Sequence, residues 1–328
     1  MLTYSPNKKP RRKDRPWLLF LMALIWIAGV TFFHAAWEPY EPYVVAIVKS
    51  IINTNSWLVP YLTPSAPYLE LQPFYFWLFA LIIKVFHFSD IANAVRLINA
   101  LIIFGVIALM GQIGSGLSAF RNGRSVIMIL ISCVGFINNA YQLSPNIVVL
   151  FGFSLYFYAL QKSAQMPGIS AWLLSIGLIF ISLNFTAQFI VIALLILFIL
   201  PLLGKEWRTP EYLICAGGGL ALFTLLFGSY VWQLNSVDHA FYLEWEGKYL
   251  SFISFNFADY GQSALFLVET LAWYLIPAWV LVVWTLYKRR SRIFQDKILT
   301  LSLLSSGLLL LFAVLSGQHD ESVIFPII

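Results

Sequence analysis

The sequence predicts an all-α polytopic membrane protein, and three observations support this fold class. Of its 328 residues, 60% are hydrophobic and 11% are charged, whereas roughly 25% are charged in soluble domains. Apolar runs long enough to cross a bilayer recur along the chain, and a basic segment directly precedes the first of them. A soluble chain of this length could not cover its surface with so few polar groups. The composition therefore excludes a soluble enzyme, a disordered protein and a secreted disulfide scaffold.

The spacing of the apolar runs predicts about nine or ten transmembrane helices. A cytoplasmic basic tail over 1–16 precedes the first span, 17–36, within a transmembrane domain that covers 17–328. The later runs are 92–117, 125–143, 147–161, 170–183, 187–203, 212–234, 263–287 and 298–316, and a tenth begins near residue 323. The stretch 170–203 is split at Asn184 because one helix of that length would overshoot the bilayer.

The distribution of Lys and Arg predicts a cytoplasmic N-terminus. With this orientation, the tail and the inner loops hold sixteen of the twenty basic residues. The outer segments hold the other four: Lys49, Lys84, Arg96 and Lys248. This asymmetry follows the positive-inside rule, and treating 170–203 as one span would invert everything after it. The basic tail thus needs no nucleic acid as a partner, since anionic lipid attracts it equally well.

Two outer segments, 37–90 and 235–262, are too long to be simple turns. Prolines divide the first into short pieces, so helices over 43–53 and 74–86 are expected to lie along the interface, with their aromatic rings at headgroup level. The second segment alternates aromatic and charged residues. The residues that could perform chemistry therefore gather at the outer surface rather than at the midplane, where transporters usually bind their substrates.

The chain lacks the common nucleotide and metal motifs. It has no P-loop, dinucleotide fingerprint, HExxH or CxxC pattern. Its four His are not spaced as a metal pair on one helix would be, and Cys133 and Cys215 lie in apolar runs as small buried hydrophobes. The sequence thus specifies no resident cofactor.

Three outer carboxylates are the candidate catalytic groups. Glu38 and Glu41 lie just after the first span, and Glu70 lies between Leu69 and Leu71, where it needs a partner or a polar cavity. Such carboxylates can act as a base on a hydroxyl or hold a divalent cation against a phosphate. A solvated turn is the alternative for the first pair, and whether a metal is used stays open.

The order of motifs over 37–101 resembles the membrane glycosyltransferases of the GT-C fold, in the group of aminoarabinose–lipid A transferase and the protein O-mannosyltransferases. The resemblance rests on an acidic turn at 37–43 (WEPYEPY), followed by 55–62 (NSWLVPYL), 67–78 (PYLELQPFYFWL) and 96–101 (RLINAL). The remainder of the chain follows the same order of spans with weaker motifs.

Several positions depart from the family pattern. The family's Asp and Arg at the acidic turn fall on Tyr40 and Tyr43, and the Lys after its conserved Glu falls on Leu71. An acid after the third span falls on Asn146, and a Lys in the fifth falls on Phe185. The motifs therefore match the family at positions that predict its fold more completely than at positions that predict its activity.

The resemblance implies transfer of a sugar from a polyprenyl-phosphate donor to a lipid or protein acceptor at the periplasmic face of the inner membrane, as in modification of lipid A or other cell-envelope glycans. Glu41, Glu70 and Glu38 would be the catalytic carboxylates. Arg96, Lys84 and Lys248 would bind the donor phosphate. For Arg96, snorkelling to lipid phosphates is the alternative. A non-catalytic or truncated relative that binds lipid-linked sugar or a membrane partner is the second hypothesis, and a transporter is the third.

The predicted orientation can be tested by cysteine labelling. In a variant with Cys133 and Cys215 replaced by Ala, a single cysteine at position 251 should react with an impermeant reagent applied from outside, whereas one at position 291 should not. The reverse pattern would overturn the orientation and with it the outer site.

Overall fold

The computed structural model describes residues 16–36, 38, 40–63, 66–69, 71–116, 120–183, 186–251, 257–289, 297–317 and 325–327. Their helices are α1 (Pro16–Phe32), α2 (Tyr40–Thr54), α3 (Pro73–Phe86), α4 (Ile91–Ser115), α5 (Phe120–Ser132), α6 (Val134–Tyr141), α7 (Pro145–Lys162), α8 (Pro167–Ser182), α9 (Gln188–Leu203), α10 (Pro210–Val237), α11 (His239–Leu250), α12 (Phe257–Tyr274), α13 (Ala278–Arg289) and α14 (Lys297–Leu315). Strands β1 (Tyr61–Thr63) and β2 (Ala66–Pro67) form a small antiparallel hairpin, and η1 (Lys205–Trp207) and η4 (Phe325–Ile327) are single 3₁₀ turns.

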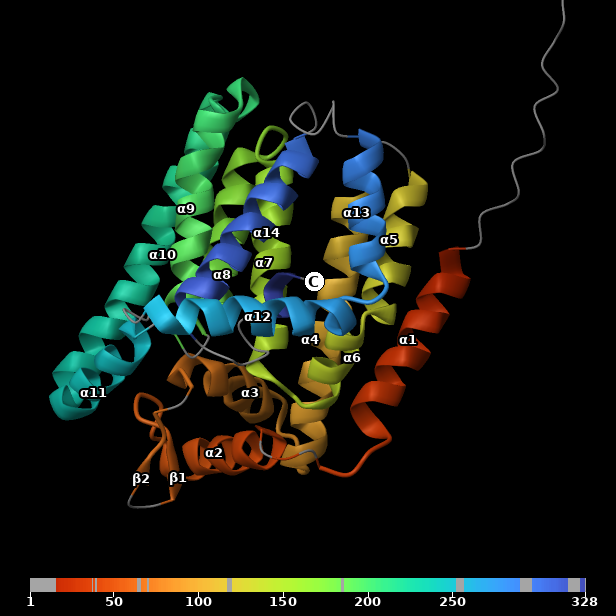
Figure 1. Ribbon diagram of the computed structural model, residues 1–328. Coiled ribbons are helices and arrows are strands. Elements are labelled where there is room, and N and C mark those ends of the chain that lie inside the picture. Colours follow the sequence, from red (N-terminus) through yellow and green to blue (C-terminus); the bar gives the residue numbers. More distant parts are fainter. Residues whose placement is uncertain are drawn as a thin grey trace, which may run out of the picture.

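The core is a bundle of upright helices around α7, as Figure 1 shows. Helix α7 is buried along most of its length, and its residues belong to both apolar clusters of the core. It packs closely on α8 through two glycines: a Cβ on Gly152 would lie 2.8 Å from the carbonyl oxygen of Gly177, and one on Gly177 would lie 2.9 Å from that of Gly152. Only residues without a side chain allow this close helix approach.

Helices α2 and α3 lie across one end of the bundle, with the hairpin beside them (Figure 1). They match the interfacial helices predicted over 43–53 and 74–86. Helix α3 begins at Pro73, whose fixed φ suits a first helical position, and it ends before His87, which has a left-handed φ of 52°. The apolar sides of both helices face the core, since Ile47, Ile51 and Phe79 are fully buried.

The spans largely follow the predicted order, and the split of 170–203 is confirmed because α8 ends at Ser182 and α9 begins at Gln188. Two predicted single spans are instead bent pairs. The run 125–143 forms α5 and α6, which meet at 65°, and the run 263–287 forms α12 and α13, which meet at 101°. In the second pair Pro277 interrupts the helix, because proline lacks the N–H that would continue the ladder. As a result α12 runs crosswise (Figure 1).

The predicted outer segment 235–262 is more helical than its mixed composition suggested. Helix α10 continues to Val237, and α11 starts at His239 after the single residue Asp238, whose carboxylate accepts a hydrogen bond from the Phe241 amide (3.0 Å). Asp238 is thus a helix N-cap. The predicted basic tail lies outside the described residues except for Pro16.

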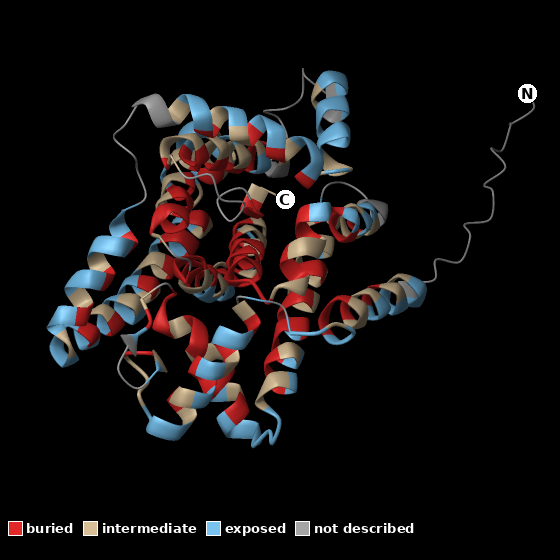
Figure 2. Ribbon diagram, turned by 60° about the horizontal axis from the view of Figure 1, so that its bottom comes forward, coloured by how far each residue is buried: buried red, intermediate tan, exposed pale blue. Residues whose placement is uncertain are grey.

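The architecture is that of an all-α polytopic membrane protein. Among the described residues, α4 and α10 are each long and apolar enough to cross a bilayer, the two bent pairs satisfy the same criteria together, and α1, α3, α8, α9 and α14 are shorter apolar helices. Figure 2 shows exposed residues on the outward sides of the helices and buried ones within. Large apolar side chains such as Phe198, Leu202 and Trp284 are among the exposed residues, as expected for surfaces that face hydrocarbon.

Candidate functional site

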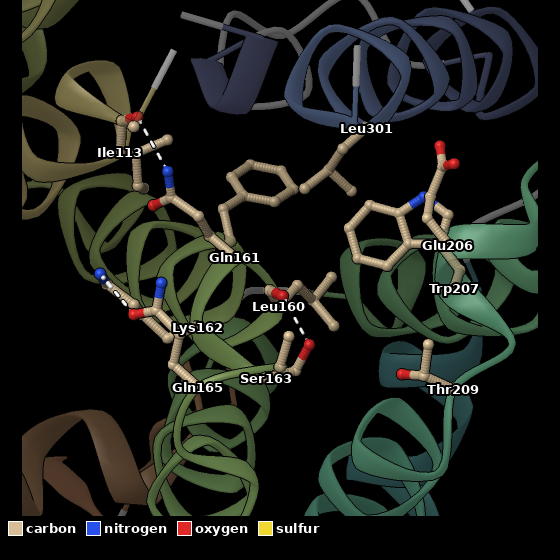
Figure 3. Close-up of a pocket in the computed structure, with 13 residues that line it drawn as sticks. Ile113, Leu160, Gln161, Lys162, Ser163, Gln165, Glu206, Trp207, Thr209 and Leu301 are labelled. Carbon is tan, nitrogen blue, oxygen red and sulfur yellow. Dashed lines mark hydrogen bonds between the residues drawn. The ribbon is translucent and has the colours of Figure 1, made fainter. Parts of the chain in front are cut away.

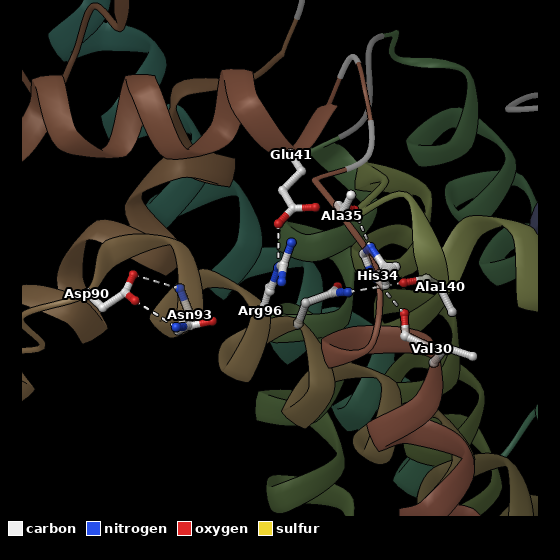
Figure 4. Close-up of polar contacts among 9 residues, drawn as sticks. Val30, His34, Ala35, Glu41, Asp90, Asn93, Arg96 and Ala140 are labelled. Atoms are coloured by element: carbon white, nitrogen blue, oxygen red, sulfur yellow. Dashed lines mark hydrogen bonds and ion pairs between the residues drawn. The ribbon is translucent and has the colours of Figure 1, made fainter.

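The central feature of the candidate site is an ion pair between Glu41 and Arg96. Arg96 donates from Nε to Glu41 Oε1 at 2.5 Å, and the two side chains are 15% and 3% exposed, respectively. They come from different elements, since Glu41 lies in the first turn of α2 and Arg96 lies near the start of α4 (Figure 4). A buried charge is tolerated only when it is paired. The pair therefore joins α2 to α4 at one end of the bundle.

The helix starts explain how these side chains meet. Helix α4 begins with an Asp90 N-cap, whose carboxylate accepts hydrogen bonds from the Asn93 amide (3.1 Å) and its side chain (2.6 Å). This start sets the rotation of α4, so that Arg96 faces α2. Glu41 lies where the partial positive charge of a helix N-terminus favours a carboxylate.

Polar residues from α1 and α4 surround the pair. Thr31, His34 and Asn99 line the same small space, with Tyr141 closing one side. Asn99 lies one turn after Arg96 and donates to the Ala140 carbonyl (3.5 Å). The space between these side chains has no room for a water molecule. We call this cluster the Glu41–Arg96 site; it is closed in the present conformation.

His34 is fixed at the end of α1. Its Nδ1 lies 2.6 Å from the Ala35 carbonyl oxygen and its Nε2 lies 3.1 Å from that of Val30. The ring also lies beside Tyr141, with 5.3 Å between the centroids. The Oγ1 of Thr31, one turn earlier, is buried and has no hydrogen-bond partner among the described residues. The site thus offers a hydroxyl and an imidazole beside the ion pair.

An apolar pocket adjoins this polar site. It has a volume of about 410 Å³ and is lined by Val134, Ile137 and Tyr141 of α6, together with Asn138 and Trp273. Tyr141 lines both spaces, so it separates an apolar pocket between α6 and α12 from the buried charges. This is the arrangement expected for a ligand with an apolar chain and an anionic end.

Of the other two predicted carboxylates, Glu38 is an exposed turn residue, and Glu70 lies outside the described residues. No three His, Cys, Asp or Glu side chains gather as a metal site would require in the part of the chain that the structure describes.

The predicted phosphate-binding lysines occupy separate places. Lys84 Nζ donates to Asn55 Oδ1 (3.3 Å) and lies 5.4 Å from the centre of the Trp57 ring. Lys248 is exposed on α11, at the edge of the molecule far from α1 (Figure 1). Of the three predicted cations, the structure thus places only Arg96 in the Glu41–Arg96 site.

The positions that depart from the family pattern fall in varied surroundings. Tyr43 is exposed beside Tyr68, with 6.2 Å between the ring centroids. Leu71 is buried in the core, and Phe185 lies outside the described residues. Asn146 is buried and donates to Asn139 Oδ1 (2.9 Å), whose own amide donates to the Tyr274 hydroxyl (2.6 Å). A neutral hydrogen-bond network therefore occupies the place of the family's acid.

Sequence reasoning identified Glu41 and Arg96 but gave them separate roles and missed their pairing. Asn99 could have been found, since it follows Arg96 by one helical turn within 96–101. The sequence gives no reason to place His34 here, since the spacing of the four His indicates no shared site. Nothing in the sequence placed Tyr141 beside it, because that contact depends on how α6 packs.

The fold and this site define the class of protein: a polytopic membrane protein with the GT-C fold. The structure superposes with a TM-score of 0.77 on the crystal structure of ArnT from Cupriavidus metallidurans bound to undecaprenyl phosphate. The match has 12% sequence identity and covers 95% of this chain and 57% of the ArnT chain. No protein-family model and no curated protein sequence matches the chain. The GT-C fold predicted from the motifs over 37–101 is confirmed.

The energetic importance of the ion pair can be measured with a double-mutant cycle. Arg96→Met should lower the free energy of unfolding by roughly 3–5 kcal/mol, because it leaves the Glu41 charge buried without its partner. Adding Glu41→Gln should recover part of this loss, which gives a coupling energy of about 0.5–3 kcal/mol. Denaturation of the purified protein in detergent micelles provides the measurement. Lys49→Met, on the exposed side of α2, is the control and should change stability by about 0.5 kcal/mol or less. Strictly additive losses would show that the pair contributes no coupling.

Proposed function

We propose that this chain is a glycosyltransferase that moves a sugar from a polyprenyl-phosphate donor to a lipid or protein acceptor at the outer face of the membrane. The observation that carries the proposal is a buried Glu41–Arg96 pair next to an apolar pocket. The fold supports it as well, since its structural neighbour ArnT was crystallised with undecaprenyl phosphate.

The two adjoining spaces suit the two ends of such a donor. The isoprenoid chain would lie against Val134, Ile137 and Trp273, and the phosphate would pass Tyr141 to reach Arg96. A guanidinium can hold two phosphate oxygens at once. Glu41 is hydrogen-bonded to Arg96 in the closed site. Donor binding therefore requires the donor phosphate to replace the Glu41 carboxylate on the guanidinium.

This exchange would couple donor binding to catalysis. Once the phosphate binds Arg96, the Glu41 carboxylate no longer contacts the guanidinium and can accept a proton from the acceptor. The anomeric C–O bond breaks with its electron pair moving to the phosphate, and the sugar carbon gains oxocarbenium character. Arg96 stabilises the charge that develops on the leaving phosphate. The acceptor hydroxyl forms the new C–O bond and its proton passes to Glu41. An acceptor that is already ionised, such as a lipid phosphate, would need no base.

The proposed location follows from charge. Sixteen basic residues on one side of the predicted topology and four on the other support an N-terminus in the cytoplasm of a plasma (inner) membrane. Helices α2 and α3, which belong to the first predicted outer segment, then lie on the periplasmic side. A donor presented from the outer leaflet would reach Arg96 from this side, with Lys84 or Lys248 assisting only after a change of conformation.

A non-catalytic relative that binds lipid-linked sugar is the second candidate. The neutral residues at Tyr40, Tyr43 and Leu71 favour it, as does the network of Asn146 and Asn139 where the family has an acid. Both candidates require donor binding at Arg96, and they differ in whether sugar is transferred.

Donor binding can be tested with Arg96→Lys. Lysine keeps the positive charge but cannot hold two oxygens in one plane. The loss of a hydrogen bond to a charged group costs about 1.5–3 kcal/mol, so binding of a polyprenyl-phosphate sugar should weaken about tenfold or more. The measurement is a Kd for purified protein in detergent micelles, with Lys49→Gln as a control that should bind as the parent does.

Three other results of this binding experiment would change the proposal. Equal affinity of the parent and Arg96→Lys would show that Arg96 is only a lipid anchor. Absence of binding to both would remove the lipid-linked donor from the proposal. Binding without sugar transfer to any lipid or peptide acceptor would favour the non-catalytic candidate.

A further inference from the structure

A second cavity lies at the opposite end of the bundle from α2 and α3. It has a volume of about 480 Å³ and lies where α4 and α7 end, next to η1 and the start of α10 (Figure 3). Ile113 lines it, and seventeen residues of α4 separate Ile113 from Arg96, which corresponds to about 25 Å along the helix. The cavity is therefore distinct from the Glu41–Arg96 site.

One wall of the cavity holds a buried hydrogen-bond acceptor. The Gln161 amide nitrogen donates to the Ile113 carbonyl (3.2 Å), but the Gln161 Oε1 is buried without a partner among the described residues. This amide packs against Gly116, where a Cβ would lie 1.8 Å from the amide nitrogen. A buried acceptor without a donor costs free energy. The wall is thus suited to a ligand that brings a donor.

Charged groups of both signs line the cavity. Helices α4 and α7 both end here, and helix C-termini carry a partial negative charge. The Glu206 carboxylate lies on the opposite wall from these helix ends and also favours a cation. Lys162 lies across the cavity from Glu206, as Figure 3 shows. Thr209 and the N-terminus of α10 add a hydroxyl and a partial positive charge, which favour an anion.

Apolar side chains form the rest of the lining. Phe157, Leu160 and Leu301 border the cavity, and the Trp207 ring, 3% exposed, forms another wall. A zwitterionic headgroup attached to apolar chains fits this combination. In the predicted topology the cavity lies at the level of the cytoplasmic headgroups, where such lipids are available.

We propose that this cavity binds the headgroup of phosphatidylethanolamine. The primary ammonium donates to the Glu206 carboxylate, and the phosphate meets Lys162 on the opposite wall of the cavity. Phosphatidylcholine has the same charges but no N–H, and phosphatidylglycerol has no cation. The recognition is therefore of the ammonium, not only of charge.

Native mass spectrometry of the delipidated full-length protein tests this proposal. With an equimolar mixture of phosphatidylethanolamine, phosphatidylcholine and phosphatidylglycerol, we expect the protein to retain one phosphatidylethanolamine in preference to the others. Glu206→Gln should lower this preference about tenfold, as loss of a charged hydrogen bond predicts. The matched control is Glu211→Gln, since Glu211 lies five residues later outside the cavity lining and should keep the preference.

A second pair of variants and a soluble ligand complete the test. Lys162→Gln should weaken retention of phosphatidylethanolamine, whereas Lys205→Gln, on the exposed side of η1, should not.

Excess glycerophosphoethanolamine should not displace the lipid if the acyl chains contribute to binding. Displacement would assign the site to a soluble ligand instead. Equal retention of the three lipids by the parent, or an unchanged preference in Glu206→Gln, would overturn the proposal. Equal Tm values of parent and variants exclude misfolding as the cause.

Discussion

The buried ion pair between Glu41 and Arg96 is the interaction on which the functional end of this protein depends. It is 2.5 Å long, almost fully buried on the Glu41 side, and joins two helices that cross at the end of the bundle. Burial of the Glu41 carboxylate is tolerated because it is paired with the guanidinium. Because α2 is held against α4, helices α2 and α3 are held across the end of the bundle, where Phe79 and Ile83 of α3 are buried.

In the structure Glu41 holds Arg96, and the space beside them has no room for a water molecule. A donor phosphate that replaces Glu41 would release a carboxylate at the moment when a base is needed. The cavity near Gln161 lies about 25 Å away along α4, and the side chains proposed to bind lipid there belong to α7 and η1 rather than to α4.

Hydropathy and charge were sufficient to predict the helical membrane fold, the split between α8 and α9, and the presence of helices α2 and α3. The split was predicted because a continuous helix over 170–203 would overshoot the bilayer. The bends at Cys133 and before Pro277 were not predicted. Both halves of each helix pair are apolar, and the mean hydropathy of a segment does not reveal a change in the direction of the helix axis.

Glu41 and Arg96 were found as individual charges in recognisable motifs. Their pairing was not, since it depends on the angle between α2 and α4, which the sequence does not display. His34, Thr31 and Tyr141 were missed for the same reason.

The most direct test is a pair of experimental structures of the protein in lipid nanodiscs, without and with undecaprenyl phosphate. The distance from the Arg96 guanidinium to the Glu41 carboxylate is the decisive quantity. The account predicts that the two are hydrogen-bonded without the lipid. With it, Arg96 should hold the phosphate while Glu41 turns away, and the isoprenoid chain should lie between α6 and α12. An unchanged Glu41–Arg96 pair with the lipid phosphate bound elsewhere would contradict it.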